Sequence, residues 1–207
     1  MRRILLSAVL ATFFIAFPLQ AAASEGAGGQ AGEAKGSREV LKRQLKAFPS
    51  AEGFGAETRG AYGKSALTPK VYRVTTLEDP GTRAPTLDGS FRWAIEAPEP
   101  RVIVFAVSGY IVIKRPLVIE NPYVTIAAQS APGDGICLRN DPAYGKDTIT
   151  IATHDVIVRH LRVRPGRANP GVKVGSQEAI QVGQEKAQTY NVIIDHCSAT
   201  WGIDGCI

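Results

Sequence analysis

Short runs of β-branched residues recur along this chain from residue 101 onward, and three of them align with one another. The three begin at Val124, Val156 and Val192, which lie 32 and 36 residues apart, and each ends in polar residues. In this alignment His160 falls on His196. A near-constant period with like residues in register is typical of stacked coils, because one coil cannot bury its inner face alone. The pattern therefore predicts an all-β fold, a right-handed parallel β-helix.

Other fold classes fit the sequence less well. The predicted strands are residues 71–75, 102–107, 111–113, 117–119, 124–127, 136–138, 148–151, 156–163, 179–182 and 192–194, with a turn and a short helical piece at Asp88–Ile95. No segment between the strands from residue 101 onward has ten or more residues with helical periodicity, which excludes βαβ units. A β-sandwich would favour two-residue hairpin turns such as Asn-Gly, and the chain has no Asn-Gly pair.

The N-terminal residues are expected to lie outside this fold. Residues 1–23 combine a basic start, an apolar stretch and a small-residue exit, the layout of a secretory signal peptide. The apolar stretch is shorter than the roughly 20 residues that a membrane-spanning helix needs. Residues 24–37 are rich in Gly and Ala and predict a flexible leader. Residues 38–48 have helical spacing and predict a short N-terminal helix, so the β-helix domain is expected over residues 38–207.

Charge and cysteine content limit the partners. The formal net charge is +5, and cleavage after residue 23 would remove Arg2 and Arg3 and leave +3. The chain has no basic stripe interleaved with aromatic residues, so a nucleic-acid partner is not expected, whereas an acidic polysaccharide is compatible. After signal cleavage we expect a secreted monomer that does not associate with a membrane.

The three cysteines, Cys137, Cys197 and Cys206, are an odd number for an exported protein. We expect buried free thiols, with a Cys197–Cys206 bridge as the alternative, and the absence of a CxxC pair argues against a structural zinc site.

Acidic residues cluster late in the chain and predict a metal site. Glu178 precedes one predicted strand, Asp195 follows the next, and Asp204 lies nine residues later. If one coil separates Glu178 from the later acids, their carboxylates converge on one outer face. Hard oxygen ligands from neighbouring coils are suited to calcium. The alternative is that these acids cap turns by accepting hydrogen bonds from backbone amides.

His196 next to Asp195 also suggests a general base. Adjacent strand residues point to opposite faces, so we expect that this pair cannot form a hydrogen-bonded dyad. We expect instead that His160 and His196 stack on successive coils. Ser198 has no matching base, and no GxSxG motif is present.

Five segments, taken in order, resemble successive motifs of the bacterial pectate lyases of polysaccharide lyase family 1. They are Ala47–Ala56, Val104–Gly109, Thr125–Ile136, Val156–Gly166 and Asn191–Ser198. The resemblance implies a parallel β-helix, secretion, and calcium-assisted β-elimination of polygalacturonate (pectate). A calcium ion bound to both the sugar and the protein would stabilise the negative charge that develops as the proton leaves C5. In this family the base is an arginine.

Carried over by position, the resemblance implies calcium ligands at Glu178 and Asp204 and a structural role for Asp195. Glu178 stands where the family usually has an aspartate, and Gly205 stands where relatives usually carry a glutamate. The resemblance also implies that the arginine base lies beyond Ile207, so no catalytic residue is assigned within this chain. Four remaining arginines are expected to be surface or substrate-facing charges: Arg159, Arg162, Arg164 and Arg167.

On this basis the chain is expected to be an N-terminal fragment, an interrupted reading frame or an incomplete record, inactive by itself. The alternative from another class is a non-catalytic β-helix that binds acidic polysaccharide. A β-helix glycoside hydrolase needs a close pair of carboxylates, for which Glu178, Asp195 and Asp204 are available, but the ordered motifs favour the lyase.

Overall fold

The computed structural model describes residues 45–63, 68–82 and 87–207. All of them belong to the second of the two units into which the chain divides, Gln44–Ile207. The predicted signal peptide, the leader and residues 38–44 of the predicted helix lie outside the described residues. No helix among the described residues is long and apolar enough to cross a membrane.

The described strands form three parallel sheets. The five-stranded sheet consists of β1 (Lys70–Val74), β2 (Arg101–Phe105), β5 (Val124–Ala127), β8 (Val156–Arg159) and β11 (Val192–Asp195). The four-stranded sheet consists of β3 (Gly109–Ile113), β6 (Ile136–Asn140), β9 (Arg162–Val163) and β12 (Ser198–Ala199). The three-stranded sheet consists of β4 (Leu117–Ile119), β7 (Ile149–Ile151) and β10 (Ile180–Val182).

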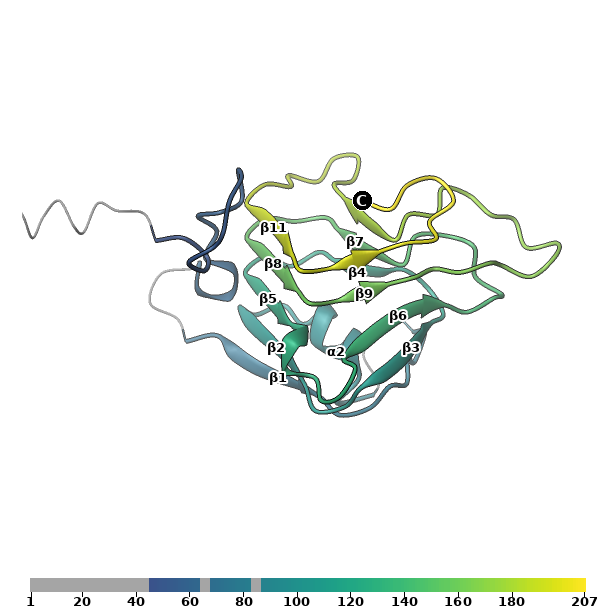
Figure 1. The fold of residues 1–207 in the computed structure, drawn as a ribbon, viewed down its shortest axis with the longest axis horizontal. Helices are drawn as coiled ribbons and strands as arrows, with labels where there is room; N and C mark the ends of the chain where they lie inside the picture. Colours follow the sequence, from purple (N-terminus) through teal and green to yellow (C-terminus); the bar gives the residue numbers. More distant parts are fainter. Residues whose placement is uncertain (1–44, 64–67, 83–86) are drawn as a thin grey trace, which may run out of the picture. The chain divides into compact units, whose positions relative to one another are not determined.

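From β2 onward the chain visits the five-stranded, the four-stranded and the three-stranded sheet in turn and then repeats the circuit. Every strand pairs in parallel with a strand of the neighbouring coil. Figure 1 shows the coils stacked from β1 and β2 at one end to β11 at the other. This is the predicted parallel β-helix. Two 3-10 turns, η1 (Gly60–Tyr62) and η2 (Ala128–Ser130), accompany it.

The predicted register is confirmed. Val124 pairs with Val156, and Val156 pairs with Val192, so the three valines stack on successive coils. One predicted strand is divided, because the run 156–163 turns at His160 into the separate strands β8 and β9. The two-residue strand β12 was not predicted, since Ser198 and Ala199 carry no β-strand signal of their own.

The core is a stack of aliphatic side chains inside the coils. Ile103, Ile126 and Val158 occupy one register position on three successive coils and are buried. Burying one such side chain contributes about 1.5–3 kcal/mol relative to leaving it exposed. Like residues in register therefore supply both the driving force and the alignment of the coils.

Two corners of the coil use left-handed backbone at non-glycine residues. Tyr123, Asp155 and Asn191 stand immediately before β5, β8 and β11, with φ values of 61°, 55° and 52°. At the second corner, between the five-stranded and four-stranded sheets, His160 and His196 also adopt left-handed backbone, with φ values of 58° and 52°. Asn, Asp and His are enriched in this region because short polar side chains tolerate it best. At the histidine corner only two residues separate the strands of the two sheets (160–161 and 196–197), whereas the other corner ends a longer connection (120–123, 152–155 and 183–191).

A short helix, α2 (Phe91–Glu96), packs into the core beside β1 and β4. It corresponds to the turn and short helical piece predicted for residues 88–95. Ser90 caps it by accepting a hydrogen bond from the backbone N–H of Trp93. On its buried side Arg92 donates through Nε to Asp79 at 2.5 Å and through its terminal nitrogens to the carbonyl oxygens of Arg115 and Pro116. This buried guanidinium ties α2 to the segments before and after it.

The N-terminal helix predicted for residues 38–48 is not confirmed. Its described end, residues 45–48, forms a loop and bends, and Pro49 disfavours helical backbone at Phe48. The loop instead packs Phe48 and Ala47 against a small apolar cluster that includes Ile157 of β8 and Ile193 of β11.

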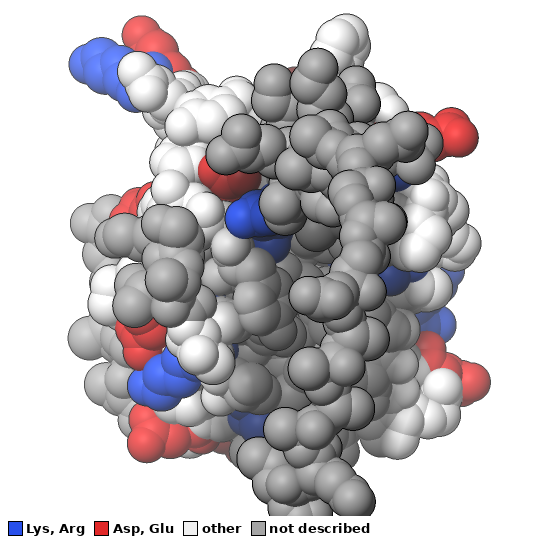
Figure 2. Space-filling model, turned by 90° about the vertical axis from the view of Figure 1, so that its left-hand side faces the viewer, with Lys and Arg blue, Asp and Glu red and all other residues white. Residues whose placement is uncertain are grey.

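The cysteines are unpaired, as expected, but only Cys137 is buried; Cys197 is half-buried and Cys206 is exposed. Figure 2 shows acidic and basic side chains interspersed among the described residues of the face that it presents, without a block of one sign.

Candidate functional site

A row of carboxylates lies at the start of the three-stranded sheet, on successive coils. Asp147 precedes β7 and Glu178 precedes β10, and the backbone N–H of Glu178 donates to Asp147 Oδ1 at 2.9 Å. The next coil brings residues 204–206 onto the same edge, since the amides of Ala179 and Ile180 donate to the carbonyl oxygens of Gly205 and Cys206. We call Asp147, Glu178 and Asp204 the acidic row.

The acidic row is electrostatically unfavourable without a cation. Burial raises the pKa of Glu178, and the charges of Asp147 and Asp204 raise it further. Asp204 Oδ2 also accepts a hydrogen bond from the Ser176 hydroxyl at 2.9 Å, which orients that carboxylate. The side chains of the acidic row offer only oxygen donors, the kind that a hard divalent cation such as calcium prefers. The donor chemistry therefore fits the predicted metal. Among the described residues, the group whose ligand atoms lie close enough together to hold a metal ion is His160, Asp195 and His196, and not the acidic row.

The structure brings two of the three predicted metal ligands together and places the third elsewhere. Glu178 and Asp204 belong to the acidic row. Asp195 ends β11 in the five-stranded sheet, where its carboxylate pairs with Arg159 Nε at 2.6 Å and with His196 Nδ1 at 2.9 Å. These partners satisfy the Asp195 carboxylate locally, in agreement with the structural role that the resemblance implies.

The expectation that Asp195 and His196 cannot form a hydrogen-bonded pair is wrong. It assumed strand geometry at both residues, but His196 adopts left-handed backbone with φ of 52°. This conformation interrupts the strand alternation and returns the imidazole to the side of Asp195. Burial raises the pKa of Asp195, but the hydrogen bonds from Arg159 and His196 outweigh burial and hold that pKa below its usual value.

The predicted stacking of His160 on His196 is confirmed. The ring centroids lie 4.9 Å apart, with an interplanar angle of 23°. Together with Asp195, the two imidazoles bring potential ligand atoms within 4.8 Å of one another. Because Arg159 already neutralises Asp195, we interpret this cluster as a stacked corner that holds β8 against β11.

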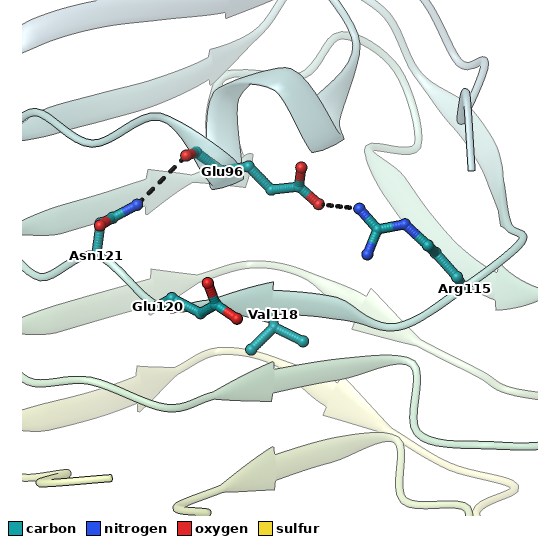
Figure 3. A pocket seen from close by; sticks show the side chains of 5 residues that line it. All are labelled: Glu96, Arg115, Val118, Glu120 and Asn121. Carbon is teal, nitrogen blue, oxygen red and sulfur yellow. Dashed lines mark hydrogen bonds and ion pairs between the residues drawn. The ribbon is translucent and has the colours of Figure 1, made fainter. Parts of the chain in front are cut away.

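A polar hollow of about 200 Å³ lies beside the first coil (Figure 3), lined by Glu96, Arg115, Val118, Glu120 and Asn121. Glu96 Oε1 accepts from Arg115 at 2.5 Å, and the Asn121 amide donates to the Glu96 carbonyl oxygen at 3.3 Å. Glu96 Oε2 and Arg115 Nε are buried without a hydrogen-bond partner. No residue of the acidic row lines this hollow, so it is a separate feature of the surface.

Asp147 is not among the site residues predicted from the sequence. A signal was present, because Asp147 and Glu178 both lie two residues before strands that pair as Ile149 with Ile180. The alignment of Val124, Val156 and Val192 covers the five-stranded sheet, whereas this signal lies on the three-stranded sheet.

Comparisons with known proteins point to one group of enzymes. The chain is 42% identical over 160 residues to probable pectate lyase C of Emericella nidulans and 39% identical over 160 residues to the protein of that name from Neosartorya fischeri. Each alignment covers 77% of this chain and 32% of the relative. Probable pectate lyase 4 of Arabidopsis thaliana is 33% identical over 152 residues, which cover 70% of this chain and 36% of that protein. No family model matches the chain.

These relatives are fungal and plant proteins, so the bacterial assignment made from the motifs is not supported. The chain spans about a third of the length of the relatives it matches. Over more than two thirds of its own residues, this chain is similar to proteins named as pectate lyases, which supports the pectate lyase family that its five ordered motifs indicate.

Proposed function

We propose that this chain is part of a secreted, calcium-dependent pectate lyase that cleaves polygalacturonate by β-elimination. The observation that carries the proposal is the acidic row, which gathers carboxylates of successive coils at one edge of a β-helix similar to pectate lyases. Secretion through residues 1–23 is part of the proposal.

Glu178 and Asp204 are the proposed calcium ligands, with Asp147 as a third carboxylate of the same edge. Burial raises the pKa of Glu178, and the charges of Asp147 and Asp204 raise it further; a bound divalent cation would relieve the repulsion between these charges. When bound, calcium would neutralise the sugar carboxylate and make the neighbouring C5 proton more acidic. Asp195 is not included in this ligand set, because Arg159 and His196 already occupy its carboxylate.

The protein side chains would position the substrate. A uronate chain is repelled by the acidic row in the absence of a cation, so binding at this edge should require calcium. Following the resemblance, we place the arginine base beyond Ile207. Within the chain Arg159 is a poor candidate, since Asp195 pairs with it and its guanidinium lies 4.0 Å from the centroid of the Phe48 ring.

The test is a calcium titration of the 207-residue chain by calorimetry, together with ultraviolet detection of unsaturated product from polygalacturonate. Wild type should bind calcium, and Glu178→Gln should weaken calcium binding by at least about tenfold, because it removes one carboxylate ligand (about 1.4 kcal/mol per tenfold). Glu185→Gln is the control, since Glu185 is an exposed glutamate in the loop after β10.

Equal calcium affinity in wild type and Glu178→Gln would contradict the proposed ligand set. Calcium-dependent product from the 207-residue chain would support the lyase and contradict the placement of the base beyond Ile207. Calcium-dependent binding of polygalacturonate without product, in a longer protein that contains the following coils, would favour the non-catalytic polysaccharide-binding alternative.

A further inference from the structure

A basic and aromatic surface covers the outer side of the four-stranded sheet. One hollow, of about 300 Å³, is lined by Tyr110 of β3, Arg139 of β6, Arg164, Gly166 and Trp201. A second, of about 420 Å³, is lined by Gly166, Arg167, Trp201 and Ile203. The two hollows share Gly166 and Trp201 and are therefore adjacent; together we call them the arginine–tryptophan surface.

The stacking of the coils brings its arginines together. Leu138 pairs with Val163, so the residues that follow them, Arg139 and Arg164, stand at equivalent positions of adjacent coils. The backbone N–H of Arg164 donates to the Leu138 carbonyl oxygen at 2.9 Å, which extends the pairing to this point. The positive charges of Arg164, Arg162 and Arg139 all act on the Cys137 thiol, although burial still raises the pKa of that group.

These guanidinium groups have no acidic partner. Across the described ranges, the ion pairs of arginine involve Arg92, Arg115 and Arg159, and none involves Arg139, Arg164 or Arg167. Arg162 donates to the backbone oxygen of Asp134 and not to a carboxylate. Stacked like charges repel one another, and an anion that bridges them relieves this repulsion. The surface is therefore complementary to a polyanion.

Its aromatic residues are exposed to an unusual degree. The exposed fractions of Trp201 and Tyr110 are 67% and 60%. Trp201 has φ of 65°, a conformation that is rare for a bulky residue and costs conformational energy. The Arg164 guanidinium lies 5.7 Å from the centroid of the Trp201 ring. An indole face next to unpaired guanidinium groups can stack on the apolar face of a sugar while the guanidiniums bind its carboxylates in a bidentate manner.

We propose that the arginine–tryptophan surface binds a uronic-acid oligosaccharide, with Trp201 stacked on a sugar ring and Arg139 and Arg164 bound to carboxylates. This inference rests on the proposed function for the identity of the polyanion. It adds a second contact for the same polymer, because the segment from Trp201 to Asp204 runs from this surface to the acidic row. Binding here needs no metal ion, in contrast to binding at the acidic row.

The test is calorimetric titration of the 207-residue chain with a galacturonate oligomer in the presence of a chelator. Wild type should bind under these conditions. The double variant Arg139→Gln/Arg164→Gln should bind at least tenfold more weakly, and Trp201→Ala should also weaken binding. Arg73→Gln is the matched control, since Arg73 is an exposed arginine of β1 on another sheet, and it should change the affinity less than twofold. Circular dichroism and the melting temperature check that each variant is folded.

The proposal would be overturned if wild type did not bind the galacturonate oligomer in chelator, or if wild type and the double variant bound it equally. It would also be overturned if wild type bound a DNA oligomer of the same charge with the same affinity as the galacturonate oligomer. That result would show electrostatic attraction without recognition of the sugar. The proposed function fails in a different way, through loss of the response to calcium. If wild type binds the oligomer in the presence of chelator but does not bind calcium, this surface is supported and the acidic row is not a metal site.

Discussion

At the scale of single residues, Arg92 has the most demanding environment in the described part of the chain. Its side chain is fully buried, and Asp79 neutralises it through two hydrogen bonds of 2.5 and 2.7 Å. Burial by itself raises the pKa of Asp79, but Arg92 and the backbone amides of Lys114 and Gly81 outweigh burial and hold that pKa below its usual value. The pair is therefore ionised and joins α2 to the chain before it.

We predict that Asp79→Asn destabilises the fold by about 3–5 kcal/mol, because it leaves the buried charge of Arg92 without its main partner. The measurement is the free energy of unfolding in urea. Lys70→Gln is the control: it breaks the exposed Lys70–Glu99 pair and should cost much less, because exposed ion pairs are screened by water. Similar losses in the two variants would show that Arg92 does not depend on Asp79.

The hydrogen bonds of Glu99 make the free energy of unfolding depend on pH. Its carboxylate accepts hydrogen bonds from the Tyr72 hydroxyl at 2.6 Å and from Lys70 at 3.0 Å, and these two partners lower its pKa from 4.5 to about 2. A carboxyl group whose pKa is lowered in the folded state stabilises that state above its ordinary pKa of 4.5. This contribution is lost as the pH falls from 4.5 towards 2.

Wild type should therefore lose more unfolding free energy between pH 5 and pH 2 than Glu99→Gln, which cannot ionise at this position. Unfolding in urea at several pH values over this interval measures the difference. Glu185→Gln should follow the wild-type profile. Parallel profiles for wild type and Glu99→Gln would contradict the assigned role of Glu99.

At the scale of elements, the loop from residue 45 to η1 depends on close contact with β11. A Cβ atom at Gly55 would lie 2.1 Å from the carbonyl oxygen of Val192, which is backbone and cannot move aside alone. The same loop contributes Ala51 and Ala56 to the cluster that includes Ile193. Only a residue without a side chain allows this loop to lie against the outer side of the coils.

We predict that Gly55→Ala destabilises the protein by about 1–3 kcal/mol or releases the loop, because overpacking forces the backbone apart. Thermal unfolding and limited proteolysis within residues 45–63 measure the two outcomes. Gly175→Ala should be neutral, since a Cβ atom there meets nothing within 4 Å. An alanine variant at Gly55 with wild-type melting temperature and protease resistance would contradict the contact.

Elements also differ in how far the sequence predicts them. β4 and β5 were predicted with the observed bounds, because each is a β-branched run between Pro, Asn or Gly and has a partner in register. β12 could not be predicted from Ser198 and Ala199, because pairing with β9 alone makes it a strand. The contact between Asp195 and His196 was missed for a related reason, since a left-handed residue reverses the side on which a side chain lies. Tertiary pairing and corner conformations are not encoded in local β-propensity.

At the scale of the whole described unit, stability should vary from coil to coil. β5, β6 and β8 have a hydrogen-bonded strand on both sides, whereas β1 and β11 have one among the described strands. In a stacked repeat, each coil is stabilised mainly by its neighbours. The central coils should therefore open least often.

Hydrogen exchange followed by mass spectrometry tests this expectation. Peptides from residues 124–163 should exchange most slowly, and those from β1, β11 and β12 fastest. Destabilising Gly55→Ala should accelerate exchange in β11 before it affects β5. Uniform protection across all strands would instead show that the coils unfold together as one cooperative unit.

The left-handed corners at Tyr123, Asp155 and Asn191 mark the boundaries of a one-coil structural unit. A segment that runs from one such corner to the next, such as Asp155 to Tyr190, contains one strand of each sheet and returns to the same corner one coil higher. Its two ends are then separated by roughly one strand spacing, about 4.8 Å along the stack. Such a segment behaves as an interchangeable part, because a copy can be added without altering the backbone path on either side. Lengthening of this protein by whole coils, in evolution or in the laboratory, should therefore be tolerated best when the joints coincide with these three residues.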